Sequence, residues 1–296
     1  LQQPEVKAPP FLVHPVHPLR VEGERILADT VFCGGQWGPE AVAQIPTHPG
    51  TGVEEASSEP GGTLSPRVVG GREACKDCLV PKPVMPAILA RGDTVLVPAP
   101  AYPIHTYSTI FAGGNVRTLP LVGDGTGRVD GDALLGSVEE ACRSATPGPR
   151  ALVLSFPNNP TTLTSDRGFF ERAVELCHRE RILLVHDFAY ADFGFDEEPA
   201  SLLQVPGARE IGVEFFSMSK SYCMAGWRVG FCVGNAAMVQ ALTRIKSYLD
   251  YGIFQPIQIA AAHALRAGQE CVAETRETYR RRADALVAGL HGAGWM

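Results

Sequence analysis

From Gly212 to Phe231 the chain reads GVEFFSMSKSYCMAGWRVGF. The apolar run Val213–Phe216 leads into Ser217-Met218-Ser219-Lys220, and a second apolar run begins at Val229, directly after Arg228. Short apolar runs that are bounded by polar turns are typical of buried strands. The stretch therefore predicts two strands of a sheet, with serines, a lysine and an arginine gathered at one end of them.

The alternation of apolar runs and helical patterns extends from about Ala90 to the end of the chain. Apolar runs predict the further strands Thr94–Val97, Val116–Leu121, Ala151–Phe156, Ile182–Val185 and Val229–Val233. Helical spacing predicts helices over Asp130–Ala145, Asp166 to about Glu180, Asn235–Leu249, and Pro256 toward Leu290 with an interruption near Gly268. Strands that alternate with helices indicate an α/β fold, in which helices cover both faces of a mostly parallel sheet.

Polar side chains follow these strands at the points where the strands end. They are Tyr102 after the first strand, Asn159 after the third, Asp187 and Tyr190 after the fourth, and Ser217, Ser219 and Lys220 after the fifth. In sheets of this kind the functional site lies at the carboxyl ends of the strands. We therefore expect these side chains, with Arg228, to share one site. Two histidines are ambiguous: His105 follows Tyr102, and His186 is expected on the opposite sheet face from Asp187, in the core or behind the site.

The chemical types in this set match the needs of pyridoxal 5'-phosphate. This cofactor requires a lysine amine for its Schiff base, a carboxylate for its pyridine nitrogen and donors for its ring hydroxylate. It also requires an aromatic ring for stacking, and hydroxyls with a guanidinium for its phosphate. The residues that match these needs, in the same order, are Lys220, Asp187, Asn159 with Tyr190, Tyr102, and Ser217 with Ser219 and Arg228.

From about Ala90 to Trp295 the chain resembles class I/II pyridoxal-phosphate-dependent aminotransferases of fold type I. The lysine stretch carries this resemblance, because the S-x-S-K-x(7)-R spacing from Ser217 to Arg228 is highly specific. The later segment KSYLDYG, Lys246–Gly252, is similar to the subgroup that contains alanine (glutamate–pyruvate) transaminases and LL-diaminopimelate aminotransferases. The resemblance implies a fold type I large domain over residues 90–262 and the start of a truncated second domain over 263–296.

The resemblance also implies a role for each candidate residue. Lys220 would hold the cofactor as a Schiff base and shuttle the proton between substrate Cα and the cofactor. Asp187 would pair with the pyridinium nitrogen of the cofactor, and Asn159 and Tyr190 would hydrogen-bond its phenolic oxygen. Tyr102 would stack on the ring. The phosphate would be bound by Ser217, Ser219 and Arg228. No metal is expected. The implied reaction moves an amino group between an amino acid, first of all alanine or glutamate, and a 2-oxo acid, in a homodimer.

Three alternatives stay open beside this reading. The first is LL-diaminopimelate transamination, and the second, less favoured, is a carbon–sulfur lyase on the same fold. The third is a truncated, non-catalytic product that binds the cofactor at most. An absorption band that appears on addition of pyridoxal phosphate, and that Lys220→Ala abolishes, distinguishes the enzyme from a polypeptide that does not bind the cofactor.

Residues 1–89 do not match the resemblance. They contain 13 of the 24 prolines, no sustained apolar period and no tyrosine, although relatives carry an N-terminal tyrosine that reaches the partner's phosphate. Pro81, Pro83 and Pro86 are expected to prevent a helix there. The segment is either a divergent extension or, as we favour, a non-homologous or frame-shifted translation. The arginine that binds the substrate carboxylate in relatives would lie beyond Met296.

Composition excludes other classes of protein. The 296 residues include 26 basic and 32 acidic ones, for a net charge of −6, and this argues against nucleic-acid binding. No apolar run reaches the roughly 18 residues of a membrane helix. No signal peptide is visible, so a cytoplasmic location is the default. The pair Cys75 and Cys78 lacks the further ligands of a zinc site.

Overall fold

The computed structural model describes residues 20–22, 25–27, 69–70, 84–249 and 254–295. The chain divides into two units, Leu1–Asp29 with Gly35–Ser65 and Thr30–Gly34 with Pro66–Met296. In the first unit, strand β1 (Arg20–Glu22) pairs antiparallel with β2 (Arg25–Leu27). Cys75, Cys78, the end of the KSYLDYG segment and most of the first 89 residues lie outside the described residues, so the expectations for them stay predictions.

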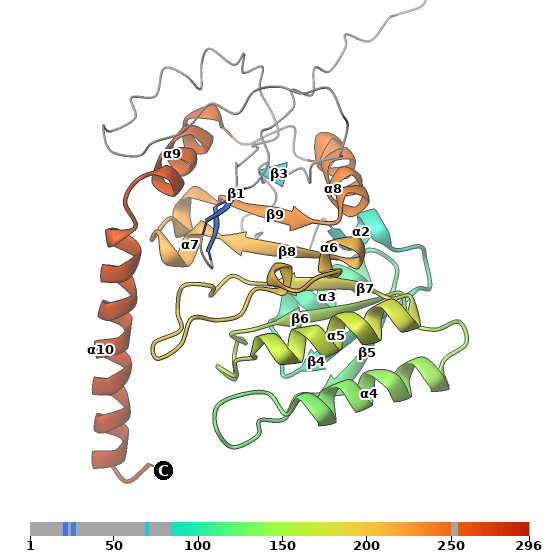
Figure 1. The fold of residues 1–296 in the computed structure, drawn as a ribbon, viewed down its shortest axis with the longest axis horizontal. Helices are drawn as coiled ribbons and strands as arrows, with labels where there is room; N and C mark the ends of the chain where they lie inside the picture. The colour runs from blue at the N-terminus through green and yellow to red at the C-terminus, as the bar shows by residue number, and fades with distance from the viewer. Residues whose placement is uncertain (1–19, 23–24, 28–68, 71–83, 250–253, 296) are drawn as a thin grey trace, which may run out of the picture. The chain divides into compact units, whose positions relative to one another are not determined.

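The second unit is built on a seven-stranded sheet in the order β3-β9-β8-β7-β6-β4-β5 (Figure 1). Its strands are β3 (Val69–Gly70), β4 (Thr94–Ala99), β5 (Asn115–Pro120), β6 (Ala151–Ser155), β7 (Leu183–Asp187), β8 (Gly212–Ser217) and β9 (Gly230–Gly234). Strands β4 to β8 are all parallel, whereas β9 is antiparallel to β8 and β3 is antiparallel to β9. The predicted mostly parallel sheet is confirmed, and each predicted strand is present.

Most helices of this unit connect strands of the sheet, whereas the last three follow β9, the last strand. The helices are α2 (Val84–Ile88), α3 (Pro103–Phe111), α4 (Gly131–Ser144), α5 (Arg167–Glu180), α6 (Ala208–Ile211), α7 (Met218–Ser221), α8 (Ala236–Leu249), α9 (Gln255–Arg266) and α10 (Glu270–Gly292), with the short 3₁₀ turns Leu202–Gln204 and Ala225–Trp227. Asp130 and Asp166 cap α4 and α5 by accepting hydrogen bonds from backbone amides of the first turn. The expected interruption near Gly268 is the break between α9 and α10.

Two helices depart from the sequence prediction. Helix α3 was not predicted. It begins with Pro103 at its first position, where a backbone N–H has no intrahelical acceptor, so the missing amide hydrogen costs nothing. Helix α2 contains Pro86, which was expected to prevent a helix. For Pro86 that expectation was wrong, because this proline lies in the first turn, where proline is tolerated, whereas Pro81 and Pro83 lie outside the described residues. Val84 and Met85 of α2 are fully buried, so the core of the second unit begins before the predicted boundary at residue 90.

Apolar side chains fill both faces of the sheet. On one face, Leu152, Leu154 and Leu184 pack with the inward residues of α4 and α5, such as Leu134 and Phe170. On the other face, the alternate strand residues pack with α2 and α8; they include Val95, Val153, Val185, Val213 and Phe215. This alternation decides which side chains of each strand can reach the site.

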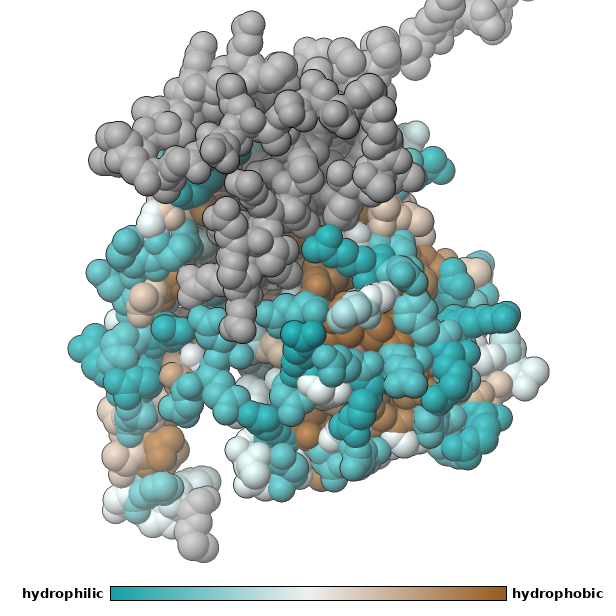
Figure 2. Space-filling model, in the orientation of Figure 1, coloured by the Kyte–Doolittle hydropathy of each residue, from teal (hydrophilic) through white to brown (hydrophobic). Residues whose placement is uncertain are grey.

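The outward face of α4 and α5 is largely hydrophilic (Figure 2). Near the end of α10, Leu286, Val287 and Leu290 are exposed. Within the described ranges, no helix combines the length and the apolar character that crossing a membrane requires.

Candidate functional site

The strand ends bring the predicted site residues to one edge of the sheet. Strands β4, β6, β7 and β8 are parallel, so their carboxyl ends lie at the same edge. Asp187 and Ser217 are the last residues of β7 and β8. Because β9 runs antiparallel to β8 and Gly230 pairs with Ser217, Arg228 also lies at this edge, just before β9 begins.

Asp187 is buried and paired with a histidine. Its Oδ2 atom lies 2.9 Å from Nε2 of His105, and the two residues are 5% and 2% exposed. The other carboxylate oxygen accepts a hydrogen bond of 3.2 Å from the backbone amide of Ala189. Tyr102, the residue before α3, joins the group through an edge-to-face contact with the His105 ring. A buried carboxylate held in this way is suited to bind a protonated ring nitrogen.

Tyr190 links the lysine to the asparagine. Asn159 Nδ2 donates a hydrogen bond of 3.5 Å to the Tyr190 hydroxyl, and Lys220 Nζ lies 5.5 Å from the centre of the Tyr190 ring. Burial, and then the negative charge of Asp187, raise the pKa of Tyr190, while the hydrogen bond from Asn159 opposes the rise. The phenol therefore stays protonated at neutral pH and can donate a hydrogen bond to a ligand oxygen. Lys220 itself is exposed, which leaves its amine accessible.

Donors without partners lie beside the lysine. The Ser217 hydroxyl accepts a hydrogen bond of 3.2 Å from the backbone amide of Ser219. The Ser219 hydroxyl and Arg228 Nε are buried and have no hydrogen-bond partner in the part of the chain that the structure describes. Buried donors are normally paired, so these two atoms call for an acceptor that comes from a ligand. A phosphate group supplies such oxygens, and the residues present therefore fit the phosphate of the predicted cofactor.

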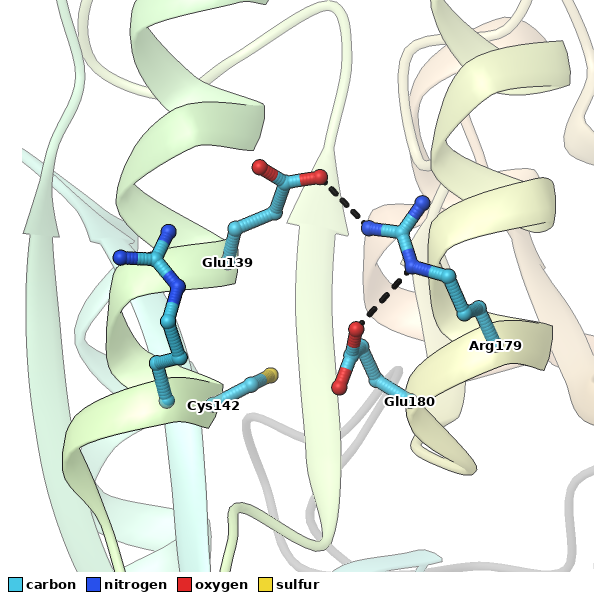
Figure 3. Close-up of a pocket in the computed structure, with 5 residues that line it drawn as sticks. Glu139, Cys142, Arg179 and Glu180 are labelled. Carbon is cyan, nitrogen blue, oxygen red and sulfur yellow. Dashed lines mark hydrogen bonds and ion pairs between the residues drawn. The ribbon is translucent and has the colours of Figure 1, made fainter.

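A separate hollow of about 420 Å³ lies between α4 and α5, away from the strand ends (Figure 3). It is lined by Glu139, Cys142, Arg143, Arg179 and Glu180. The Arg179 guanidinium donates to both Glu139 and Glu180, so all three of these charged groups are already paired. Burial and the nearby Glu180 charge raise the pKa of the Cys142 thiol, which keeps it in its less reactive form. We therefore do not assign a catalytic role to this hollow.

The family model of the class I and II aminotransferases matches residues 83–296. The chain belongs to this family. It is 52% identical to the glutamate-pyruvate aminotransferase AlaC of Escherichia coli K12, over 72% of this chain and 50% of that protein. It is 41% identical to an LL-diaminopimelate aminotransferase of Nitratidesulfovibrio vulgaris DP4, over 70% of this chain and 52% of the relative. The chain thus spans about half the length of the curated relatives it matches.

Solved structures of related proteins share the fold. The N-succinyldiaminopimelate aminotransferase of Mycobacterium tuberculosis aligns with a TM-score of 0.65 at 29% identity, covering 72% of this chain and 55% of the other. Substrate-bound BacF of Bacillus subtilis aligns with a TM-score of 0.63 at 31% identity, covering 71% and 52%. The fold type I resemblance is confirmed. Members of the family use pyridoxal phosphate, which agrees with the cofactor expected from the sequence.

Sequence reasoning left two features of this candidate site unassigned. The first is His105 as the partner of Asp187; its spacing of three residues from Tyr102 places it in the first turn of α3, and this is the signal that was available. The second is Asn158, whose side-chain oxygen accepts hydrogen bonds from the Thr161 amide and hydroxyl and so shapes the loop that carries Asn159. His186 is confirmed as a buried residue on the other face, where it contacts Glu214.

Proposed function

We propose that the full-length protein is an aminotransferase that uses pyridoxal phosphate to move an amino group between an amino acid and a 2-oxo acid. The observation that carries this proposal is the site at the strand ends. There, a buried Asp187–His105 pair, a Tyr190–Asn159 pair and the Lys220 amine accompany two buried donors, Ser219 Oγ and Arg228 Nε, that have no acceptor among the described residues.

Each residue has a physical task in this proposal. Bound pyridoxal phosphate withdraws electrons from the substrate Cα and so stabilises the carbanion formed there. Lys220 Nζ would hold the cofactor and, once the substrate amine has displaced it, would carry the proton between Cα and the cofactor. Asp187 neutralises the protonated ring nitrogen, and His105 keeps the carboxylate oriented. The remaining contacts would be hydrogen bonds to the ring oxygen from Asn159 and Tyr190, stacking by Tyr102, and phosphate binding by Ser217, Ser219 and Arg228.

For the substrates we favour alanine or glutamate with pyruvate or 2-oxoglutarate. The 52% identity to the glutamate-pyruvate aminotransferase AlaC supports this choice. LL-Diaminopimelate is the second candidate, because an LL-diaminopimelate aminotransferase matches this chain at 41% identity over a stretch of similar length. A panel of amino donors, assayed with pyruvate and 2-oxoglutarate as acceptors, separates the two. Faster turnover of LL-diaminopimelate than of alanine and glutamate would reverse our preference.

The proposal includes a homodimer and a cytoplasmic location. Helix α3 exposes Tyr107 and Ile110, with 53% and 50% of their surface accessible, and this apolar face is suited to a second copy. Free thiols at Cys142, Cys177 and Cys232 suit a reducing compartment. In the proposed division, the cofactor domain runs to residue 262 and 263–296 begin the second domain; the boundary with the atypical N-terminal segment, expected at residue 90, moves to the beginning of α2 at Val84. Analytical ultracentrifugation tests the dimer.

The cofactor role of Lys220 is tested directly on this chain. We expect added pyridoxal phosphate to produce a visible absorption band of the bound cofactor, and peptide mass spectrometry after borohydride reduction to locate the pyridoxyl group on Lys220. Lys220→Ala should lose both signals. Lys220→Arg keeps the positive charge over Tyr190 but offers no amine for the bond, so it should lose them as well.

The outcomes separate the competing functions. No band and no modified peptide would support the alternative of a non-catalytic product. A band with slow conversion of one amino donor, but without repeated turnover, would instead indicate a cofactor-binding fragment. Repeated turnover supports the aminotransferase.

A further inference from the structure

A second histidine–carboxylate pair lies directly behind the site, on the opposite face of the sheet. His186 precedes Asp187 on β7, and strand alternation turns its side chain toward α5. It lies opposite Glu214 of β8 in the strand register, and its Nδ1 atom is 2.9 Å from Glu214 Oε2. His186 is fully buried and Glu214 is 9% exposed. The pair is thus an integral part of the core under the site.

Glu214 is held by donors from outside the sheet. Its carboxylate accepts hydrogen bonds from the Ser201 hydroxyl at 2.9 Å and from the Leu202 backbone amide at 2.8 Å, in addition to His186. Because a carboxylate is the partner of Nδ1, that nitrogen carries a proton. The Phe170 ring of α5 meets the imidazole edge to face, and Phe188 stacks against it. These contacts leave the imidazole one orientation.

In that orientation, Nε2 of His186 reaches the neighbouring strand. It lies 3.2 Å from the backbone oxygen and 3.4 Å from the backbone nitrogen of Phe156. Phe156 follows the last residue of β6 and comes three residues before Asn159. Strands β6, β7 and β8 lie side by side in the sheet (Figure 1). One imidazole therefore connects the three neighbouring strands that lead to Asn159, Asp187 and Lys220, at the end of β6, near the end of β7 and within β8.

We propose that His186 is a positioning residue for the cofactor site: it fixes the Phe156 backbone, and with it the loop that carries Asn159, relative to Asp187 and Glu214. This proposal rests on the proposed function, because it assigns a purpose to the fixed loop. Asn158 is bonded within the loop to Thr161 and to the Leu163 backbone, and Asn159 is bonded to Tyr190 on the site side, so the His186 contact is the described link between the start of the loop and the far face of β7. A displacement of the order of 1 Å at such a loop is enough to weaken a ligand contact.

Two substitutions divide the two contacts of the imidazole. His186→Asn keeps an amide near the position of Nδ1, where it can serve Glu214, but reaches no further. His186→Gln places an amide near the position of Nε2, where it can serve Phe156. Leu176→Ala, in the same apolar cluster on α5, is a matched control that weakens the core without touching the pair.

The affinity of each variant for pyridoxal phosphate is measured by absorbance titration, and hydrogen–deuterium exchange of residues 156–163 is followed in the cofactor-free protein. We expect His186→Asn to raise the Kd about tenfold and to accelerate exchange of the loop, because the substitution breaks a buried hydrogen-bond network. His186→Gln should stay within about threefold of the parent Kd, and Leu176→Ala should change neither measurement of the site.

Equal Kd values and equal loop exchange for the parent, Asn and Gln proteins would overturn the proposal and leave His186 as a packed core residue. Weaker binding by the Leu176→Ala control to the same degree would overturn it too, because general destabilisation would then explain the effect. If the parent chain binds no pyridoxal phosphate, the proposed function fails. The exchange data still decide whether His186 holds the loop: faster exchange in Asn alone supports it, and equal exchange overturns it.

Discussion

His186 and Asp187 are neighbours in the sequence, yet they belong to two pairs of opposite character. In both pairs a histidine nitrogen lies 2.9 Å from a carboxylate oxygen, and both pairs are buried. Glu214 receives hydrogen bonds from a side chain and a backbone amide besides His186, so its acceptors are occupied. Asp187 faces the strand-end site with one backbone donor besides His105. The first pair is closed and holds structure, whereas the second retains capacity for a ligand.

The sharpest test of this difference is Asp187→Asn. The amide preserves the size and most hydrogen bonds of the carboxylate, but it removes the negative charge that a protonated ring nitrogen needs. We expect transaminase turnover to fall roughly 10²–10³-fold, the loss associated with removing one electrostatic group from a site. Chemical denaturation should show nearly unchanged stability. A variant that unfolds easily but turns over normally would place Asp187 in the structural class with Glu214.

Glu214→Ala is the corresponding test on the other face. It leaves the Ser201 hydroxyl, the Leu202 amide and His186 Nδ1 without their acceptor in the core. Each unpaired buried donor costs about 1 kcal/mol or more, so we expect the free energy of unfolding to fall by about 3 kcal/mol. Urea denaturation of the cofactor-free protein measures it. Glu214→Gln, which keeps an acceptor oxygen, should lose less than the alanine variant.

His105→Phe tests the support of Asp187 from the site side. Phenylalanine fills the space of the imidazole but donates no hydrogen bond to the carboxylate. Of the two partners of Asp187, His105 and the Ala189 amide, only the amide then remains to orient it. We expect a loss of about tenfold in cofactor affinity, as for one hydrogen bond to a charged group. His105→Gln offers an amide near the position of Nε2 and should recover part of it. Equal affinity in all three proteins would remove His105 from the site.

Most of the fold was readable from the sequence because its signals are local. Strands such as Ala151–Ser155 are buried on both faces and therefore appear as continuous apolar runs. Asp130 and Asp166 mark the beginnings of α4 and α5 as capping residues. Helix α2 was missed because its proline signal depends on position within the first turn, which cannot be known before the helix boundary is known.

The site was only partly readable, for a different reason. The S-x-S-K-x(7)-R spacing and the polar residues after each strand are properties of the chain, so Lys220, Asp187 and Arg228 could be chosen in advance. The partners of Asp187 and Glu214 are set by strand register and by the packing of α3 and the Ser201 turn. These are long-range contacts that no local pattern records. Strand alternation was enough to expect His186 on the far face, but the pairing of His105 with Asp187 required the structure.

The smallest expected effect is an electrostatic one, and it distinguishes the two faces without any cofactor. Burial and the Asp187 charge raise the pKa of Tyr190 above the ordinary 10.0. A pKa that is raised by folding contributes stability below pH 10, and this contribution is lost as the pH rises through the higher folded value.

In alkaline titrations followed by tyrosinate absorbance, the step that Tyr190→Phe removes should lie above the midpoint of tyrosine in the denatured protein. Asp187→Asn should move that step part of the way down, because burial remains. Glu214→Gln, on the far face, should leave it in place; an equal shift in both variants would mean that Tyr190 does not distinguish the two carboxylates.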